Sequence, residues 1–386
     1  MRRLAGMVAA VGMITTCQLT AGVAVTAPTA AAAPAAVSVG VPGGGVGLAR
    51  QSDRILTAMF IDTDGVLNVA WEYNNGPWHA PVRISASVAE PGTPVALSMQ
   101  TRTRFTAAFI DKWGRLNVAW LDDNGPWTQP TPISGQVAKP GGSVALAQYG
   151  DNQLTAAFVD SSGTLRTASV TGTGPWSPPA PTGGAVGIPG SPIALARHKT
   201  GQVDRMVAAI IDNTGTLNTA YQPYPGGPWT APSVVGYPLT NPGGGVALAQ
   251  QNDSTLTASF TSTYGFMHVA WVNDGGNWNG PVSVDGLNAD RGTGGGAIAM
   301  AKQTPGILVA ASVDWWGYFS VAWAENNGAW NPPVRVGGSV APHGAGVAVF
   351  KQSDNILTAA FIGNDGKLNV AWMEYTGAWA GPVPIN

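Results

Sequence analysis

The chain has 386 residues, with 19 lysine and arginine side chains against 21 aspartate and glutamate side chains, and a formal net charge of -2. Charged residues make up only 10% of the sequence without a basic excess, which argues against nucleic acid or an anionic membrane surface as a partner. The 52 glycines, 30 prolines and 45% hydrophobic residues are typical of a turn-rich protein with a large core, and favour an all-β fold.

The first 35 residues are interpreted as a secretory signal peptide. Arg2 and Arg3 precede an uncharged, largely apolar run over residues 4–25, and Ala33-Pro34-Ala35 fits an A-x-A cleavage site. The alternative is an uncleaved anchor helix, because the run is long enough to span a bilayer, although threonine, glutamine and glycine interrupt it. We therefore expect residues 1–35 to be removed, the protein to be secreted and extracellular, and the mature chain to have no membrane span.

A repeat of about 49 residues occupies the rest of the chain. Its first mark is a tryptophan two residues after a glycine, called here the Gly-x-Trp series: Trp78, Trp127, Trp176, Trp229, Trp278, Trp330 and Trp379. A second set of positions, the Trp71 series, precedes it: Trp71, Trp120, Ser169, Tyr221, Trp271, Trp323 and Trp372. Repeats of this length indicate one supersecondary unit used again and again.

Each unit is predicted to hold four short strands. In the first unit they are Val46–Ala49, Leu56–Ile61, Leu67–Trp71 and Pro81–Ile84, with turn signals such as Gln51-Ser52-Asp53 between them. The second strand is apolar on both of its faces, which indicates a sheet buried on both sides. Four-stranded sheets at a period of about 40–50 residues are typical of propeller blades. A β-solenoid has a shorter period, and a string of β-sandwiches needs longer units.

We therefore predict an all-β fold with a single domain over residues 36–386, a seven-bladed β-propeller with four antiparallel strands per blade. A closed ring leaves no apolar blade face exposed and protects the sheet edges. The stretches Val37-Ser38-Val39 and Pro382–Ile385 look alike, so one of them could complete a blade opened by the other. The predicted repeats are about 43–90, 91–139, 140–188, 189–240, 241–291, 292–341 and 342–386.

One rim of such a propeller is expected to carry the binding site. In an up-and-down blade, the end of the first strand, the end of the third strand and the start of the fourth strand lie on the same rim. The candidate ligand-binding residues are Gln51, Trp71, Trp78, Trp120, Trp127, Gln251, Trp271, Trp278, Gln303, Trp323, Trp330, Gln352, Trp372 and Trp379. The Gly-x-Trp series could instead wedge one blade against the next. The Trp71 series tolerates Ser169 and Tyr221, so it is the better functional candidate.

The opposite rim and the remaining polar residues offer no catalytic pattern. Aspartates precede a glycine by three residues in five repeats and are interpreted as Asx turn caps, because their spacing does not match a calcium loop: Asp62, Asp111, Asp160, Asp212 and Asp314. The four histidines have no metal-ligand spacing, and no carboxylate pair or nucleophile motif stands out. The one cysteine, Cys17, precedes the predicted cleavage site. We expect no enzyme activity, no metal and no cofactor.

Two short motifs carry a resemblance to a known family. Leu67-Asn68-Val69-Ala70-Trp71 and Asn75-Gly76-Pro77-Trp78 resemble the repeats of bacterial and fungal propeller lectins. The motif is similar to that of six-bladed fungal fucose lectins, and the blade count to that of seven-bladed, fucose-binding lectins of Photorhabdus type. The resemblance covers about Val46 to Asn386. It departs from the family in two places, because Asn68 stands at the glutamate position and the sugar-binding arginine of the second strand is missing.

The resemblance implies a lectin whose partners are glycans or glycoconjugates, fucosylated or O-methylated. The residues agree with this implication, because a tryptophan face can stack on sugar C–H groups while glutamine and asparagine bind hydroxyls. Shallow sites repeated round a ring would gain avidity on a glycan-coated surface. Two alternatives remain open, a non-catalytic protein-interaction scaffold and a propeller glycan hydrolase or lyase.

Overall fold

The computed structural model describes residues 39–150, 152–284, 296–326 and 328–386. The secondary structure of these residues consists of strands and turns. A search of the same residues for a helix long and apolar enough to cross a bilayer found none. The predicted signal peptide, residues 1–35, and Cys17 lie outside the described residues, so that prediction stays untested.

The described strands form seven four-stranded sheets, and in every sheet consecutive strands pair antiparallel. The first four blades are β1 Val46–Ser52, β2 Ile55–Ile61, β3 Val66–Tyr73, β4 Val82–Ser87; β5 Ala96–Met99, β6 Arg104–Ile110, β7 Leu116–Asp122, β8 Thr131–Pro132; β9 Val144–Tyr149, β10 Gln153–Val159, β11 Thr164–Thr171, β12 Ala180–Ala185; β13 Ile193–Lys199, β14 Asp204–Ile211, β15 Leu217–Gln222, β16 Ser233–Val235. The last three are β17 Val246–Gln250, β18 Thr255–Thr261, β19 Met267–Asn273, β20 Trp278–Val284; β21 Ile298–Thr304, β22 Ile307–Val313, β23 Tyr318–Glu325, β24 Trp330–Ser339; β25 Val347–Lys351, β26 Ile356–Ile362, β27 Leu368–Glu374, β28 Trp379–Pro384.

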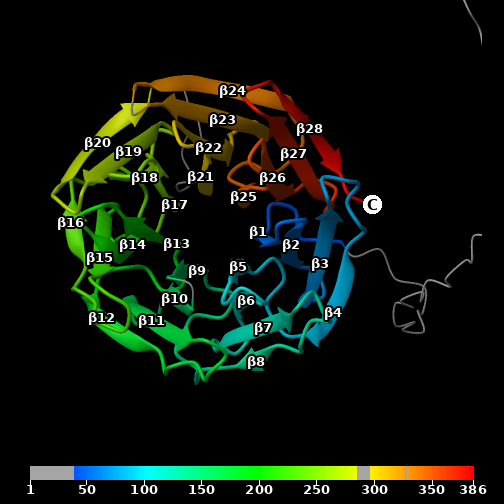
Figure 1. Cartoon of the computed structure of the whole chain (residues 1–386), viewed down its shortest axis with the longest axis horizontal. Helices are drawn as coiled ribbons and strands as arrows, with labels where there is room; N and C mark the ends of the chain where they lie inside the picture. Colours follow the sequence, from blue (N-terminus) through cyan, green and yellow to red (C-terminus); the bar gives the residue numbers. More distant parts are fainter. Residues whose placement is uncertain (1–38, 151, 285–295, 327) are drawn as a thin grey trace, which may run out of the picture. The chain divides into compact units, whose positions relative to one another are not determined.

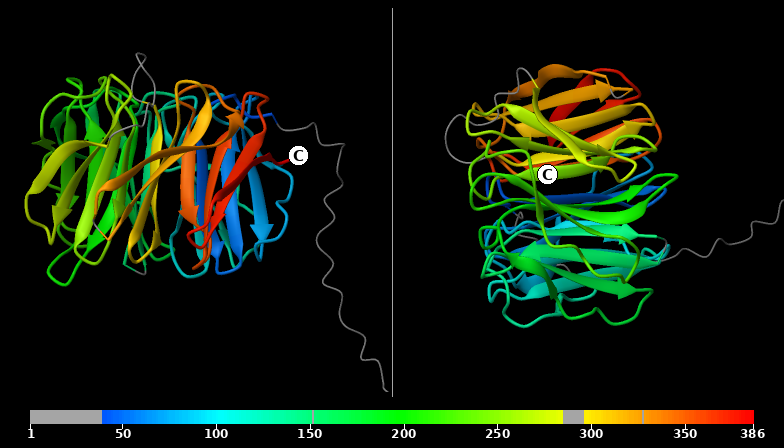
Figure 2. Two further views of the ribbon diagram at one scale, coloured as in Figure 1. Left: turned by 90° about the horizontal axis from the view of Figure 1, so that it is seen from above. Right: turned by 90° about the vertical axis from the view of Figure 1, so that its left-hand side faces the viewer.

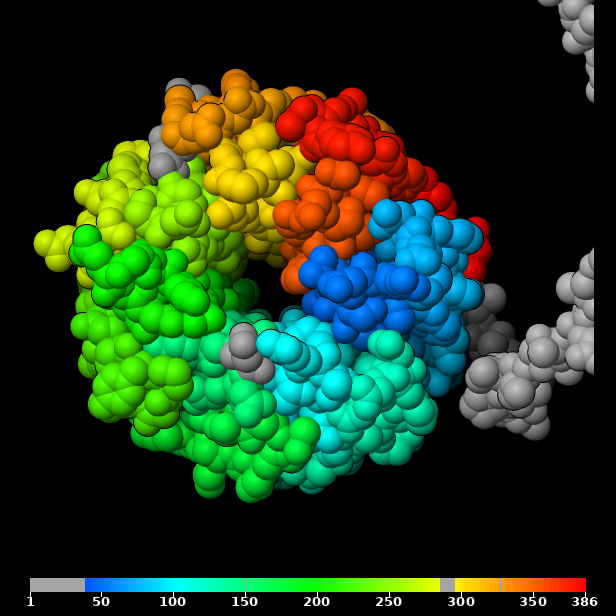
Figure 3. All heavy atoms as spheres, viewed as in Figure 1, coloured from blue at the N-terminus to red at the C-terminus, as the bar shows by residue number. Residues whose placement is uncertain are grey.

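The seven sheets stand round a common axis as the blades of a ring (Figure 1). The first strand of each blade lies innermost and the fourth lies outermost, and two side views show the sheets packed face to face (Figure 2). A hollow is visible at the centre of the face shown in Figure 3. The predicted fold, a seven-bladed β-propeller with four antiparallel strands per blade in a single domain, is confirmed.

The hydrophobic core lies in the seams between consecutive blades. Every side chain of Leu56–Ile61 in β2 is at most 1% exposed, because a strand alternates its side chains between two faces and both faces are covered. Phe60 packs with Ile362 of the seventh blade, whereas Met59 packs with Phe109 of the second blade. Apolar residues on both faces of the second strand are therefore what makes one sheet into a blade.

The ring closes without exchange of a strand between its ends. β28 at the end of the chain pairs with β27 of its own blade. The segment before β1 instead lies along the seventh blade, where Gly40 N donates to Gly366 O at 2.8 Å and Gly43 N donates to Ile362 O at 3.2 Å. Each described blade is built from four consecutive strands, so no described strand is exchanged between the two ends. Residues 37 and 38 of the N-terminal stretch lie outside the described residues, so the idea that one terminal stretch completes a blade opened by the other stays untested.

The buried aspartates are turn caps, as predicted. Asp62 Oδ1 accepts from the backbone N–H groups of Asp64 and Val66, both at 2.9 Å, and Oδ2 accepts from Asn68 Nδ2 at 3.0 Å. The same cap is repeated at Asp111, Asp160, Asp212 and Asp314. Asn68 thus holds the turn from inside the blade, which explains why an amide stands at the position where the lectin motif has glutamate.

The predicted turn after the first strand is displaced by two residues. Gln51 and Ser52 belong to β1, which passes through an irregularity in its pairing between Arg50 and Ser52 before the turn begins. This matters for the site, because the strand carries Gln51 as far as the next blade rather than leaving it in a solvent-exposed loop.

Candidate functional site

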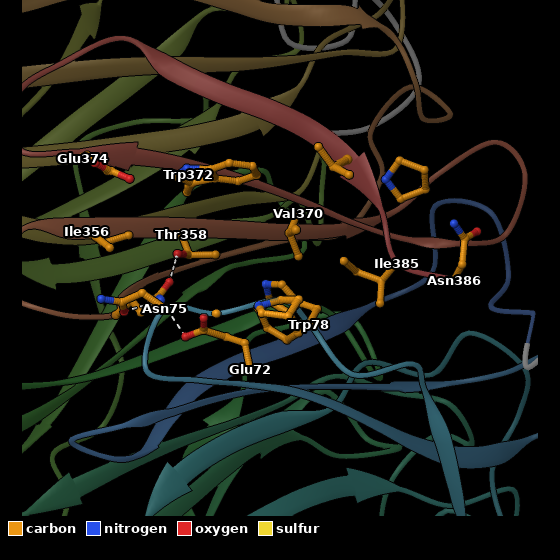
Figure 4. Close-up of a pocket in the computed structure, with 15 residues that line it drawn as sticks. Glu72, Asn75, Trp78, Ile356, Thr358, Val370, Trp372, Glu374, Ile385 and Asn386 are labelled. Atoms are coloured by element: carbon orange, nitrogen blue, oxygen red, sulfur yellow. Dashed lines mark hydrogen bonds between the residues drawn. The ribbon is translucent and has the colours of Figure 1, made fainter.

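A pocket of 480 Å³ lies between the seventh and the first blades, and is called here the 7/1 pocket (Figure 4). Trp372 of β27 forms one side, and Trp78, which follows β3 of the first blade, forms the other. Val370 and Ile385 add apolar side chains to the lining, and Figure 4 shows Val370 between the levels of the two rings and Ile385 to one side of them. Two aromatic rings facing one another across an open pocket make a site for a flat, partly apolar ligand.

The same arrangement recurs one blade earlier, in a pocket of 410 Å³ between the sixth and seventh blades, the 6/7 pocket. Here Trp323 of β23 takes the place of Trp372, and Trp379 takes the place of Trp78. Gln303 lines this pocket as Gln352 lines the 7/1 pocket. The recurrence at equivalent positions shows that the pocket is a product of the repeat.

The seam between the third and fourth blades has a smaller hollow of 320 Å³. Its lining is Tyr149, Asn152, Gln153, Thr171, Pro225 and Gly226, with no tryptophan. The third blade carries Ser169 in the Trp71 series, so the platform that Trp372 provides in the 7/1 pocket is missing here. This seam therefore lacks the pair of tryptophans that lines the 7/1 and 6/7 pockets.

A tight turn positions the Gly-x-Trp series. After β3 the chain turns through Asn74 and Asn75 in the left-handed region, with φ of 53° and 57°, and reaches Trp78 three residues later. Asparagine and aspartate tolerate this backbone conformation better than most residues, and Asp123 and Asn124 repeat the turn in the second blade. The Asn-Asn-Gly sequence thus delivers the tryptophan to the seam.

The structure pairs the predicted tryptophans across blades rather than within one repeat. Trp71 of the first blade and Trp127 of the second pack on the same core cluster, whereas Trp78 packs in the seam on the other side of the first blade. The grouping expected within a repeat, Trp71 with Trp78, is therefore replaced by a grouping of Trp71 with Trp127. Trp120 with Trp176 and Trp323 with Trp379 follow the same rule.

The Gly-x-Trp series also acts as the predicted wedge. All seven rings are half-buried and pack on the cluster between their own blade and the preceding one. Trp127 makes an edge contact with Phe105 at 5.8 Å between ring centroids, and Trp379 makes one with Phe319 at 5.4 Å. One side of these rings therefore seals a seam, while Trp78 and Trp379 also line a pocket.

Gln352, Gln303 and Gln51 link neighbouring blades, and the first two line the pockets. Gln352 is 8% exposed; its Oε1 accepts from Thr358 Oγ1, and its Nε2 donates to Asn75 Oδ1 at 2.7 Å. Gln303 Nε2 likewise donates to the carbonyl of Tyr375 in the seventh blade. Buried Gln251 accepts from Thr257 at 2.9 Å, and Gln51 donates to Asn124 of the second blade. A role for these glutamines in holding a ligand stays a prediction.

Sequence reasoning missed Glu72, which lines the 7/1 pocket. Its side chain is 3% exposed, and Oε1 accepts from Gln352 Nε2 at 2.5 Å. Burial raises the pKa of Glu72 to about 7, because removal from water disfavours the charged form. The signal was a charged residue at a position that is mostly apolar elsewhere: Leu121, Val170, Gln222, Val272, Ala324 and Met373.

Among the described residues, no group of three histidine, cysteine, aspartate or glutamate side chains could hold a metal ion. The pockets offer aromatic faces, amides and carboxyls. This chemistry is suited to reversible binding of a polyhydroxylated ligand by stacking and hydrogen bonds.

Comparisons with known proteins agree with this description. A scan against protein-family models and a search of curated proteins found no match. Among solved structures, the chain is similar to the BP39L lectin from Burkholderia pseudomallei, with a TM-score of 0.83 and 29% identity over 89% of this chain and 99% of that chain. A fucose-specific lectin from Aleuria aurantia matches with a TM-score of 0.54 and 14% identity over 90% of this chain and 97% of that chain.

AofleA from Arthrobotrys oligospora matches with a TM-score of 0.57 and 13% identity over 78% of this chain and 88% of that chain. The last two similarities show the fold alone, and the Aleuria protein is described as six-bladed. BP39L is described as a lectin, which is consistent with the expectation of no enzyme activity. The chain is thus a seven-bladed β-propeller that resembles the propeller lectins.

Proposed function

We propose that the protein is a secreted carbohydrate-binding lectin whose glycan sites are the pockets between consecutive blades. The observation that carries the proposal is the repeated pair of tryptophans, Trp372 with Trp78 and Trp323 with Trp379, each facing across an equivalent pocket. The 29% identity to the BP39L lectin over nearly its whole length supports the proposal. Sugars are the natural occupants, since one face of a hexose is apolar and its edge carries hydroxyls.

Each pocket is open and modest in size, so a single site is expected to bind weakly. Stacking on an aromatic ring contributes about 1 kcal/mol. Several such sites on one ring bind a surface dense in glycans far more tightly than one site binds a free sugar. Partners are therefore expected to be multivalent glycans or glycoconjugates, and fucosylated glycans are the first to test, because the Aleuria protein is described as fucose-specific.

A glycan array and a tryptophan variant test the proposal together. Simultaneous replacement of Trp71, Trp271, Trp323 and Trp372 by alanine should greatly weaken binding to every glycan that the native protein recognises, because only the pair of Trp120 with Trp176 keeps both tryptophans. Trp113→Ala is the matched control, because Trp113 is 47% exposed in the turn between β6 and β7, on the opposite rim. A folded quadruple variant that binds as the native protein does would place the site elsewhere, and an array without a signal would favour an interaction scaffold.

A further inference from the structure

The 7/1 pocket differs from the 6/7 pocket in one buried ionisable group. Where the 6/7 pocket presents Met373, the 7/1 pocket presents the carboxyl of Glu72. The two pockets otherwise share their tryptophan pair, their glutamine and an exposed glutamate at the rim, Glu374 in one and Glu325 in the other. Of the differences between the two linings, which also include Thr358 in place of Val309, this one places an ionisable group inside the pocket, and it is where a difference in charge specificity arises.

The charge of the two pockets differs as well. The 7/1 pocket is lined by two carboxyl side chains, Glu72 and Glu374, and by no basic side chain. The 6/7 pocket is lined by Glu325 together with Arg335. At the position of Arg335 the seventh blade has Pro384. The 7/1 pocket is therefore the more negative of the two.

Two lysines near the 7/1 pocket have partners other than its carboxyl groups. Lys367 Nζ donates to Asn386 Oδ1 at 2.5 Å, and Figure 4 draws Asn386 on the side away from Glu374. Lys351 Nζ pairs with Asp354 at 3.1 Å. Neither lysine is among the residues that line the pocket.

Glu72 is held firmly where a ligand would meet it. Gln352 fixes Oε1 from the seventh blade, and Glu72 itself forms a β-bridge with Trp78. A buried carboxylate without a cation is costly, and a cationic ligand group placed beside it recovers part of that cost. An anionic ligand group in the same place adds repulsion.

We propose that Glu72 is a specificity-determining residue of the 7/1 pocket and makes it favour a sugar with a free amino group over the same sugar with a carboxylate. The inference rests on the proposed function, since it concerns one of the proposed glycan sites. The pockets of the ring are then not equivalent, because the 7/1 pocket selects ligands by charge and the 6/7 pocket does not. Pairing of an ammonium group with a buried carboxylate is expected to change affinity by roughly tenfold.

Matched sugars test this inference. Methyl glycosides of glucose, galactose and mannose are used in three forms: neutral, 2-amino-2-deoxy and uronic acid. Calorimetric titration at neutral pH should show that the native protein binds the amino form of at least one sugar roughly tenfold more tightly than the uronic form. Glu72→Gln should reduce that ratio to within about threefold. Glu90→Gln is the matched control, because it removes the same charge from an exposed residue in the loop after β4, outside the pocket, and should preserve the ratio.

The outcomes separate the two proposals. Equal affinity of the native protein for the amino and uronic forms, or an unchanged ratio in Glu72→Gln, overturns the role of Glu72 while binding itself upholds a lectin. A protein that binds methyl α-L-fucoside but none of the nine glycosides likewise overturns the role of Glu72 only. Absence of binding to all of these and to a glycan array overturns both proposals. If Glu72→Gln does not fold, Glu72→Met, which installs the seventh-blade residue, gives the same comparison.

Discussion

Gln51 in the first blade donates a hydrogen bond from Nε2 to Oδ1 of Asn124 in the second blade, at 2.9 Å. The Oε1 atom of the same amide accepts from Thr57 of its own blade at 3.0 Å. An amide group carries a donor and an acceptor on opposite sides, so one side chain ties the second strand of one blade to the hairpin of the next. The described ring has no disulfides, so such bridges add directional hydrogen bonds to seams that are otherwise held by apolar contacts.

Removal of one bridge should weaken the ring measurably. Gln100 is 2% exposed, accepts from Thr106 at 2.8 Å and donates to the carbonyl of Gly172 in the third blade at 2.7 Å. Gln100→Leu leaves both partners buried without their bond, so the free energy of unfolding should fall by about 1–3 kcal/mol. Urea unfolding followed by tryptophan fluorescence measures the change. Gln202→Leu, in the exposed loop after β13, is the control, and equal midpoints for the two variants would contradict the prediction.

The fourth blade has a histidine at the equivalent position, which predicts acid sensitivity. His198 is 0% exposed, its Nε2 lies 3.1 Å from the carbonyl of Ser254 in the fifth blade, and its Nδ1 has no partner among the described residues. Burial lowers the pKa of His198 below the ordinary 6.5. As the pH falls through 6.5, His198 takes up a proton in the unfolded chain but stays neutral in the folded protein. The free energy of unfolding therefore falls until the pH passes the pKa of folded His198.

His198→Gln should remove that loss, because glutamine fills this position in five other repeats. The melting temperature of the variant should fall less than that of the native protein between pH 7.5 and pH 5, conditions on either side of an unperturbed histidine pKa of about 6.5. His79→Gln, at an exposed position, is the control. An identical acid shift in His198→Gln and the native protein would mean that other groups, such as buried His268, carry the effect.

Glu72 predicts a pH dependence of opposite sign. Its pKa is raised from the ordinary 4.5 to about 7, so between these values the unfolded chain releases a proton that folded Glu72 keeps. The stability associated with Glu72 is therefore complete below pH 4.5 and is lost as the pH rises to about 7. Glu72→Gln should match the native protein at low pH and exceed it above pH 7 by on the order of 1–3 kcal/mol.

Chemical denaturation across the pH range gives the measurement for Glu72. Glu374→Gln serves as the control, because Glu374 is exposed at the same pocket and should leave the pH profile almost unchanged. A constant difference between Glu72→Gln and the native protein at every pH would show that the carboxyl does not titrate in this interval.

The fold could be read from local patterns, because each blade is specified within one repeat. Apolar residues on both faces of Leu56–Ile61 indicated a sheet covered on both sides, and the Asp62-to-Gly65 spacing indicated the turn that follows. Both features depend on neighbours close in sequence. The contact between residue 40 and residue 366 repeats a bond made within other blades, such as that from Ala89 N to Gly65 O at 3.1 Å, but here the donor comes from the opposite end of the chain, which a pattern within one repeat does not reveal.

Only part of the site could be predicted, because the pockets also depend on contacts between different repeats. Topology placed Trp71 and Trp78 on one rim, but the rotation between consecutive sheets decides which neighbour each ring faces. That rotation brings Trp372 opposite Trp78, residues from the two ends of the chain. Glu72 could not be predicted from residues that recur in the repeats, because its carboxyl occurs in one repeat only.

The third blade offers a gain-of-function test of the Trp71 series. Ser169 stands opposite Thr155 on the neighbouring strand, just as Trp71, Trp120, Trp271 and Trp372 each stand opposite a threonine. Trp229 of the fourth blade already packs at this seam. Ser169→Trp should therefore complete a tryptophan pair of the kind found in the 6/7 pocket, with little strain on the blade.

We expect Ser169→Trp to bind an immobilised glycan about two- to tenfold more tightly than the native protein, because one additional stacking site raises avidity. Surface plasmon resonance on the glycan identified by the array measures the gain. Ser161→Trp, at an exposed position in the turn after β10 on the opposite rim, adds the same ring without a pocket and should change nothing. If both variants fold and bind as the native protein does, a tryptophan in the Trp71 series does not suffice to build a site, and Tyr149, a buried residue that lines the smaller hollow, becomes the next residue to replace.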